Sequence, residues 1–140
     1  MRLWLRMDRL IKWVEFPPLG DDRGSLVALE ANVTIPFDIK RVYCMYGMDS
    51  KSRGFHAHIA LQQVMVCLSG ECNVLFDNGL EKKNINMKPE NKGLFIDKMI
   101  WHEMHDFSKD CVLMVLASEW YYEDDYIRDY DDFSNLLVAL

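Results

Sequence analysis

Two histidines separated by a single residue, His56 and His58, are the side chains in this chain with the clearest chemical potential. Side chains alternate along an extended strand, so both imidazoles would point to the same side of it. The apolar run 64–68 and the turn residue Gly70 predict a second strand directly after the first. That strand begins at Gln63, which can therefore meet the two histidines on one surface. Such a surface can bind a metal ion or transfer protons near neutral pH.

A second pair of histidines, His102 and His105, lies in another strand-like segment. All four histidines of the chain thus fall in two strand motifs, which favours a functional cluster over histidines that are merely satisfied in a protein interior. Residue 63 decides between metal and acid–base chemistry, because a carboxylate offers a cation a charged oxygen whereas the amide of Gln63 offers only a dipole. Three imidazoles and an amide could still bind Zn²⁺ or Ni²⁺ weakly. We expect neither a catalytic metal nor another cofactor, and assign proton transfer to the histidines.

A tyrosine and three arginines are further candidates. Tyr43 and Arg41 are two residues apart in one strand-like segment and share a face, so a phenol that can donate to a carbonyl oxygen lies beside a cation. Arg23 and Arg53 each precede a glycine and Arg41 lies two residues before Tyr43, which suits bidentate phosphate binding. For any one arginine the alternative is ordinary surface pairing with the many carboxylates. The set favours a phosphorylated ligand.

Short strand-like segments must position these residues. Turn residues at 17–22, 69–70 and 77–79 separate them, the last with an Asn-Gly hairpin signal. The expected strands are residues 11–16, 25–30, 39–46, 56–60, 63–68, 71–77, 82–87, 93–96, 101–107 and 111–118. Only the end of the chain has helical spacing, in Tyr126, Ile127, Tyr130, Phe133, Leu136 and Leu137. The pattern predicts an all-β barrel or sandwich with a short C-terminal helix as a cap.

Composition narrows the classes of protein. The chain has 140 residues, which predicts one domain over 1–140, and its net charge of −6 with no basic block disfavours nucleic-acid binding. Its four cysteines show no C-x-x-C spacing, which excludes zinc-ribbon and thioredoxin-like readings and suggests free thiols in a reducing compartment. No apolar segment approaches the ~20 residues of a membrane span. We expect a cytoplasmic protein that does not bind membranes.

The spacing of the histidine motifs resembles the cupin superfamily. In those double-stranded β-helix barrels a first motif reads His-x-His, then Glu, then Gly, and a second motif supplies another histidine. Here the corresponding residues are His56, His58, Gln63, Gly70 and His102, with Gln63 where metal-binding cupins carry Glu. The resemblance implies an all-β double-stranded β-helix, also called a cupin or jelly-roll barrel, with the short C-terminal helix added.

Segments 22–28, 39–43, 53–58, 101–108, 115–118 and 125–128 resemble a specific branch, the nucleotide-sugar 3,4-ketoisomerases or WxcM-like domains. The likeness runs from about Asp22 to Phe133. It implies an isomerase that moves the ketone of dTDP-4-keto-6-deoxy-D-glucose from C4 to C3 without a metal. The product would be aminated to a 3-amino-3,6-dideoxy sugar for surface glycans such as lipopolysaccharide or S-layer glycans. The resemblance also implies a homodimer that exchanges N-terminal strands, with residues 1–16 as the exchanged arm.

The resemblance also implies roles for individual residues. We expect His56 to be the base that removes the C3 proton, and His58 either to deliver a proton to C4 or to orient His56. Tyr43 hydrogen-bonds the sugar oxygens while charge moves between them. The expected substrate-binding residues are Arg23, Arg41 and Arg53 at the pyrophosphate or sugar oxygens, and Gln63, Trp101 and His102 around the pocket. Arg23 and Gly24 together resemble the branch that forms the galacto-configured 3-keto product.

Three other functions compete with this interpretation. A dTDP-sugar 3,5-epimerase shares the substrate class and the barrel but requires a His–Asp dyad, and no Asp is clearly paired to either histidine motif. A metal-dependent cupin dioxygenase or isomerase is disfavoured by Gln63. A non-catalytic nucleotide-sugar-binding or sensor cupin usually carries an added DNA-binding domain, for which 140 residues leave no room.

Overall fold

Two β-sheets form most of the structure, a computed structural model that describes residues 10–140. The strands are β1 (Lys12–Glu15), β2 (Leu19–Asp21), β3 (Gly24–Leu26), β4 (Arg41–Met45), β5 (Arg53–His58), β6 (Gln63–Ser69), β7 (Cys72–Asp77), β8 (Lys82–Met87), β9 (Lys92–Ile96), β10 (Trp101–His105), β11 (Val112–Ala117) and β12 (Tyr126–Ile127). A 3₁₀ helix, Glu123–Asp125, precedes β12, and α1 (Tyr130–Ala139) follows it.

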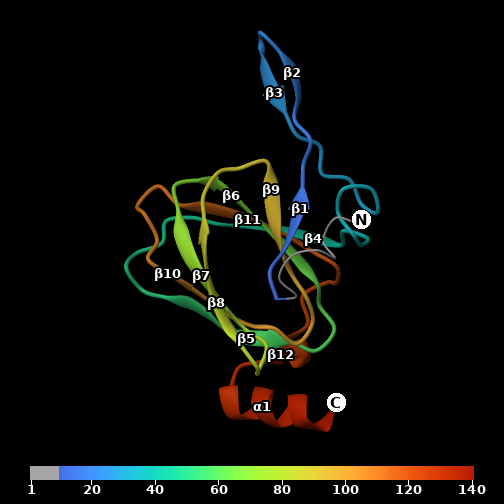
Figure 1. The fold of residues 1–140 in the computed structure, drawn as a ribbon, viewed down its shortest axis with the longest axis vertical. Helices are drawn as coiled ribbons and strands as arrows, with labels where there is room; N and C mark the ends of the chain where they lie inside the picture. Colours follow the sequence, from blue (N-terminus) through green and yellow to red (C-terminus); the bar gives the residue numbers. More distant parts are fainter. Residues whose placement is uncertain (1–9) are drawn as a thin grey trace.

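The two sheets are antiparallel and face each other as a barrel (Figure 1). One has the strand order β1-β9-β6-β11-β4 and the other the order β12-β5-β10-β7-β8. Apart from the hairpin of β7 and β8, neighbours in each sheet come from distant parts of the sequence, as in a jelly roll. The expected all-β barrel with a C-terminal helix is confirmed.

The core lies between the two sheets. Alternate residues of β6, β7 and β11, such as Met65, Val74 and Leu113, are buried in it. The outer face of the sheet that contains β6 is also covered, because Ile35 and Phe37, from the loop between β3 and β4, pack against it. Strand β6 is therefore buried on both faces, which explains its continuous apolar run.

A small hairpin, β2–β3, stands clear of the barrel (Figure 1). Residues 17–22 were expected as a turn, but β2 begins there at Leu19. The strand expected over 25–30 is confirmed only at residues 25–26, because β3 ends at Leu26. All six strand residues are exposed, so the hairpin has no buried face and leaves no alternation of apolar and polar residues in the sequence.

The C-terminal helix lies at the opposite end of the barrel from this hairpin (Figure 1). It begins after Asp129, whose side chain accepts a hydrogen bond from Asp132 N at 3.0 Å. Phe133 is its buried anchor. Tyr126 and Ile127 were expected in the helix but form β12, paired with β5.

The ten residues of α1 are about half of what a bilayer span needs. No other helix among residues 10–140 has the length and apolar character of a membrane-spanning segment.

Candidate active site

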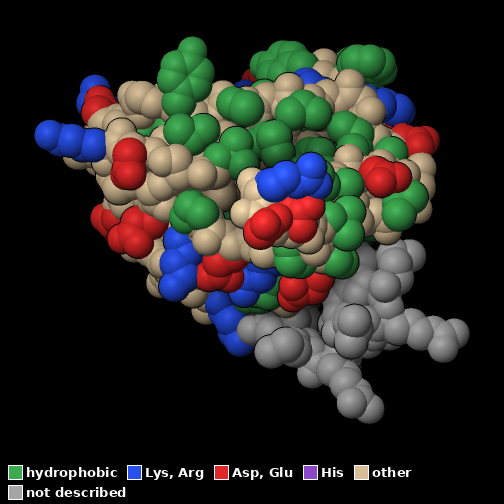
Figure 2. All heavy atoms as spheres, turned by 90° about the horizontal axis from the view of Figure 1, so that it is seen from above, with side chains coloured by type: hydrophobic (Ala, Val, Ile, Leu, Met, Phe, Trp, Pro, Cys, Tyr) green, Lys and Arg blue, Asp and Glu red, His purple; other side chains and the backbone are tan. Residues whose placement is uncertain are grey.

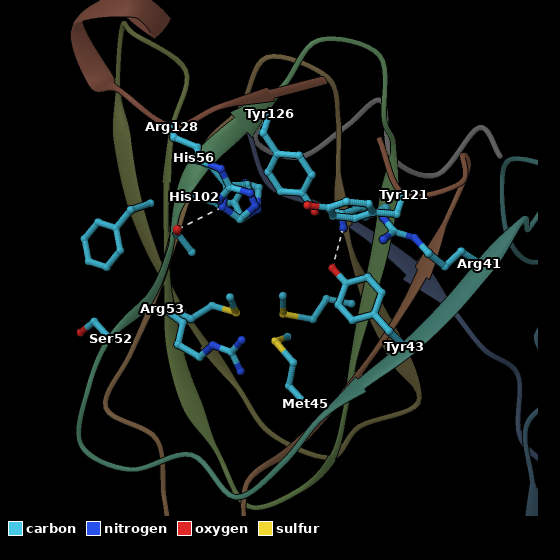
Figure 3. A pocket seen from close by; sticks show the side chains of 15 residues that line it. Arg41, Tyr43, Met45, Ser52, Arg53, His56, His102, Tyr121, Tyr126 and Arg128 are labelled. Atoms are coloured by element: carbon cyan, nitrogen blue, oxygen red, sulfur yellow. Dashed lines mark hydrogen bonds between the residues drawn. The ribbon is translucent and has the colours of Figure 1, made fainter. Parts of the chain in front are cut away.

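A cavity of about 560 Å³ opens inside the barrel, between the two sheets (Figure 3). It brings together six of the residues expected from the sequence: Arg41, Tyr43, Arg53, His56, Gln63 and His102. Tyr43 comes from β4 and His56 from β5, so the phenol and the imidazole belong to facing sheets. The predicted shared face of Arg41 and Tyr43 is confirmed, because both line this cavity.

A β-bulge in β5 aims His56 at the cavity. In the pairing with β10, His56 lies opposite His102 and Gly54 opposite Glu103, so Phe55 is an extra residue, and it has a positive φ of 59°. Gly54 has a φ of 91°, and a Cβ atom there would lie 2.9 Å from the carbonyl oxygen of His102. Only glycine fits this position, and the bulge redirects the residue that follows.

Three imidazoles form one cluster at the cavity wall. One ring nitrogen from each of His56, His58 and His102 lies within 4.8 Å of the others. The predicted convergence of His56 and His58 is confirmed, and their ring centroids are 4.9 Å apart. His58 is buried beside His56 and does not line the cavity.

The hydrogen bonds of this histidine cluster fix its tautomers. The Nδ1 atoms of His56 and His102 lie 3.0 Å from the carbonyl oxygens of Gly54 and Ile100, respectively. A carbonyl oxygen can only accept, so each Nδ1 carries the proton and each Nε2 is left with a lone pair.

Burial keeps the cluster uncharged. Together with the neighbouring imidazoles, it lowers the pKa of His58 and of His102 to about 3. Burial also lowers the pKa of His56, to a smaller extent. At neutral pH all three rings are therefore free bases.

The same three nitrogens could hold a divalent cation of borderline softness such as Zn²⁺. Histidine ligands commonly have their other ring nitrogen bonded to a carbonyl or carboxylate, as here. Gln63 adds a buried Oε1 atom that has no hydrogen-bond partner, but no charge. The donor set thus fits a weakly bound metal, and metal-free chemistry remains a prediction.

Tyr43 is prepared to donate a hydrogen bond. Gln63 Nε2 donates to its phenol oxygen at 2.7 Å, which leaves the phenol hydrogen available (Figure 3). Burial raises the pKa of Tyr43 to about 12. The phenol therefore stays protonated and can donate to a ligand oxygen.

Two arginines offer unpaired positive charge. Arg41 lies 5.2 Å from the ring of Tyr43 and 5.5 Å from that of Tyr121, and its buried Nε has no hydrogen-bond partner. In residues 10–140 no carboxylate forms an ion pair with Arg41 or Arg53. Arg128 differs, because Glu123 binds it at 2.9 Å. Arg41 and Arg53 are thus suited to an anionic ligand.

Three expected site residues lie elsewhere. Trp101 points away from the cavity, and its indole Nε1 donates to Glu103 at 2.8 Å while its ring contacts Phe133 of α1. Arg23 and Gly24 lie at the tip of the β2–β3 hairpin, where Arg23 pairs with Asp21. The structure of this single chain does not bring them to the cavity.

Sequence reasoning missed part of the cavity wall. Tyr121, Tyr126 and Arg128 line it, together with Met45, Met65 and Met104. The stretch 121–128 is aromatic and acidic, and its end was assigned to the helical spacing, so no pattern in the sequence marked it as a wall. Its mixture of tyrosines with an arginine was the available signal.

The expectation that no aspartate pairs with a histidine motif is wrong. Asp125 Oδ2 lies 3.2 Å from His58 Nδ1, although 67 residues separate the two in sequence. Pairing of β12 with β5 brings them together, with Tyr126 opposite His58. A long-range contact of this kind has no signature in a single sequence.

Comparison with known proteins agrees with the resemblance found in the sequence motifs. Residues 9–138 match the family described as "FdtA: WxcM-like, C-terminal". The chain is 49% identical over 130 residues to a TDP-4-oxo-6-deoxy-alpha-D-glucose-3,4-oxoisomerase of Aneurinibacillus thermoaerophilus, covering 92% of this chain and 94% of the relative.

Two solved structures resemble it closely. A 3,4-ketoisomerase from Helicobacter canadensis is 43% identical, with a TM-score of 0.87 over 91% of this chain and 97% of that one. A His-to-Asn variant of the 3,4-ketoisomerase QdtA from Thermoanaerobacterium thermosaccharolyticum, in complex with TDP-4-keto-6-deoxyglucose, is 39% identical. Its TM-score is 0.89 over 95% of this chain and 97% of that one.

The barrel is also shared more widely. The rmlC epimerase of Mycobacterium tuberculosis is 14% identical, with a TM-score of 0.70 over 84% of this chain and 68% of that one. At this identity the likeness concerns the fold alone.

Proposed function

This chain belongs to the FdtA (WxcM-like, C-terminal) family, and from that premise we propose that it converts TDP-4-keto-6-deoxyglucose to the 3-keto isomer. The observation that supports this most is His56, which faces the cavity with a free lone pair on a wall opposite a protonated phenol. A base and a hydrogen-bond donor on opposite walls can act on two adjacent carbons of one sugar.

The reaction is a balanced proton shift. His56 removes the proton from C3, which is acidic because it lies next to the C4 ketone, and the electrons move to O4 as an enediolate. Tyr43 donates to the oxygen that becomes negative, and this stabilises the intermediate. A proton then adds to C4, while the O3 proton leaves and O4 is protonated. No oxidant, reductant or metal is needed.

His58 packs beside His56, with the two ring centroids 4.9 Å apart. Because His58 is buried and does not line the cavity, we assign it the orientation of His56 rather than direct protonation of C4. His56 then returns the proton to C4 itself, or exchanges it with solvent beforehand.

Arg41 and Arg53 bind the diphosphate in this proposal, since neither is neutralised by a carboxylate of residues 10–140. Gln63 holds Tyr43 through its amide, and His102 packs against His56 at a centroid distance of 4.6 Å. The enzyme would serve cytoplasmic synthesis of deoxyamino sugars, in keeping with its four free cysteines.

The first test is proton NMR of TDP-4-keto-6-deoxyglucose with chelator-treated protein in D₂O. We expect the 3-keto product, with its C4 hydrogen in the galacto configuration, as the resemblance at Arg23 and Gly24 suggests. A gluco product would overturn only the configuration, and dependence on added metal would overturn the metal-free mechanism. Deuterium at C3 and C5 without keto migration would identify a 3,5-epimerase. Binding without any change would identify a sugar-binding module.

We also propose that the chain forms a homodimer with exchanged N-terminal strands. The part of the expected arm up to residue 9 lies outside the described residues, and β1 pairs with β9 of its own chain. The β2–β3 hairpin supports a partner contact, because its Leu19 and Leu26 are 57% and 59% exposed. Hydrophobic side chains also gather on the face of the molecule seen in Figure 2. A partner's hairpin could supply Arg23 to the cavity.

We expect the dimer to dissociate when Leu26 is replaced by aspartate, because a charge would be buried in the contact. Sedimentation velocity at micromolar concentration measures this. Leu80→Asp is the matched control, since Leu80 is 95% exposed on the turn after β7. Equal dimer fractions in wild type and Leu26→Asp would contradict the role of the hairpin.

A further inference from the structure

His58 is the least accessible member of the histidine cluster and the one bonded to a charged group. It is 2% exposed, and its Nδ1 lies 3.2 Å from Asp125 Oδ2. Its Nε2 is buried without a hydrogen-bond partner. The ring makes edge-to-face contacts with His56, at a centroid distance of 4.9 Å, and with Tyr126, at 4.4 Å.

Asp125 is itself held firmly by donors. Its Oδ1 accepts from Ala60 N at 2.7 Å and its Oδ2 from Leu61 N at 3.2 Å. Its carbonyl oxygen accepts from Ile59 N at 3.1 Å. Both carboxylate oxygens thus act as acceptors, and because a carboxylate can only accept, His58 approaches it as a donor through Nδ1.

We propose that Asp125 is a positioning residue that locks His58 in the tautomer with the proton on Nδ1. This inference rests on the proposed function. A proton on Nε2 would instead point toward the lone pairs of His56 and His102, since one nitrogen of each ring lies within 4.8 Å of the others. The lone pair of His56 would then accept a hydrogen bond from His58 and would not be available to take up the C3 proton. Asp125 thus keeps the base free.

The carboxylate also ties the 3₁₀ helix Glu123–Asp125 to the loop after β5, so its structural role must be separated from its effect on His58. Asp125→Asn does this. The amide oxygen can keep the short bond to Ala60 N, which leaves the amide nitrogen to donate to His58 Nδ1 and gives up only the longer bond from Leu61 N. That donation forces the proton of His58 onto Nε2.

The readout that needs no turnover is ¹⁵N NMR of histidine-labelled protein, with the His58 signals assigned from a His58→Gln variant. In wild type we expect Nδ1 of His58 protonated and Nε2 not. In Asp125→Asn we expect the reverse. Wild-type His58 with its proton on Nε2 would overturn the proposal, even if the variant does not fold.

The kinetic readout is a loss of kcat without loss of binding. We expect kcat of Asp125→Asn to fall by about 100-fold or more, as when a histidine is forced into the wrong tautomer. The KM and the Kd for TDP should stay within about threefold. Equal losses in kcat and TDP binding would indicate a merely structural role and overturn the proposal.

Asp77→Asn is the matched control. This carboxylate is also buried and also ties the C-terminal segment to the barrel, by accepting from Tyr130 Oη at 2.6 Å and Gly79 N at 2.7 Å. None of its described bonds involves a histidine. We expect Asp77→Asn to lower stability and to leave kcat and the His58 tautomer unchanged.

A double-mutant comparison completes the test. If Asp125 acts through His58, Asp125→Asn should cost little further activity in a His58→Gln background. A second loss of the full size would overturn the proposal. If wild type instead shows no keto migration, the proposed function fails, and the NMR tautomer still reports separately on the Asp125–His58 pair.

Discussion

Replacing His56 by asparagine should lower turnover by about 10³-fold or more, while TDP still binds within about threefold of wild type. Asparagine keeps a hydrogen-bonding side chain on the bulge but cannot take up the C3 proton. The arginines that we assign to the diphosphate, Arg41 and Arg53, are unaffected by the change. Product formation followed by NMR and TDP binding measured by calorimetry check the two halves of this expectation.

His105→Asn is the control for this variant. His105 lies outside the cavity wall, where it bonds Ser52 Oγ at 2.6 Å and Glu103 Oε1 at 2.9 Å. Its turnover should stay close to wild type. Loss of TDP binding in His56→Asn would instead make His56 a ligand contact, and retained turnover would require another base.

Acidification from pH 7.5 to pH 5 should lower the free energy of unfolding by about 4 kcal/mol through His58 and His102. Their pKa values of about 3 in the folded protein lie well below the 6.5 of an unfolded chain. Below pH 6.5 the unfolded state therefore binds protons that the folded state does not. Each histidine contributes about 2 kcal/mol at pH 5, and the loss continues down to about pH 3.

Urea unfolding at the two pH values measures the effect. Carboxylates also titrate in this range, so the informative comparison is with His102→Asn, which removes one of the two histidines. The pH-dependent loss should be smaller by about 2 kcal/mol in that variant. An identical loss in wild type and variant would show that His102 is protonated as easily in the folded protein as in the unfolded one.

Most of the site residues that the sequence predicts follow from the spacing of residues within one strand. The rule of alternation places His56 with His58, and Arg41 with Tyr43, without any knowledge of the fold. The same rule separates Trp101 from His102, but which of the two faces the cavity depends on how the sheets are stacked. That information is absent from a two-residue pattern, and Trp101 was expected on the wrong side.

The rest of the site depends on long-range packing. Tyr126 and Asp125 reach the histidines only because β12 pairs with β5. The hairpin β2–β3 escaped prediction for the opposite reason, since a pair of strands with no buried face has no hydrophobic pattern to detect.

The bulge in β5 has a consequence for anyone who would transplant this chemistry into another barrel. Copying the histidines alone would place His56 on a regular strand, one residue out of step with His102. The recipient would also need a residue like Phe55 in the left-handed region, which costs on the order of 1 kcal/mol or more. Above all it would need Gly54, whose missing side chain leaves room for the carbonyl oxygen of His102. The position of the base is thus encoded in a residue that has no functional group of its own.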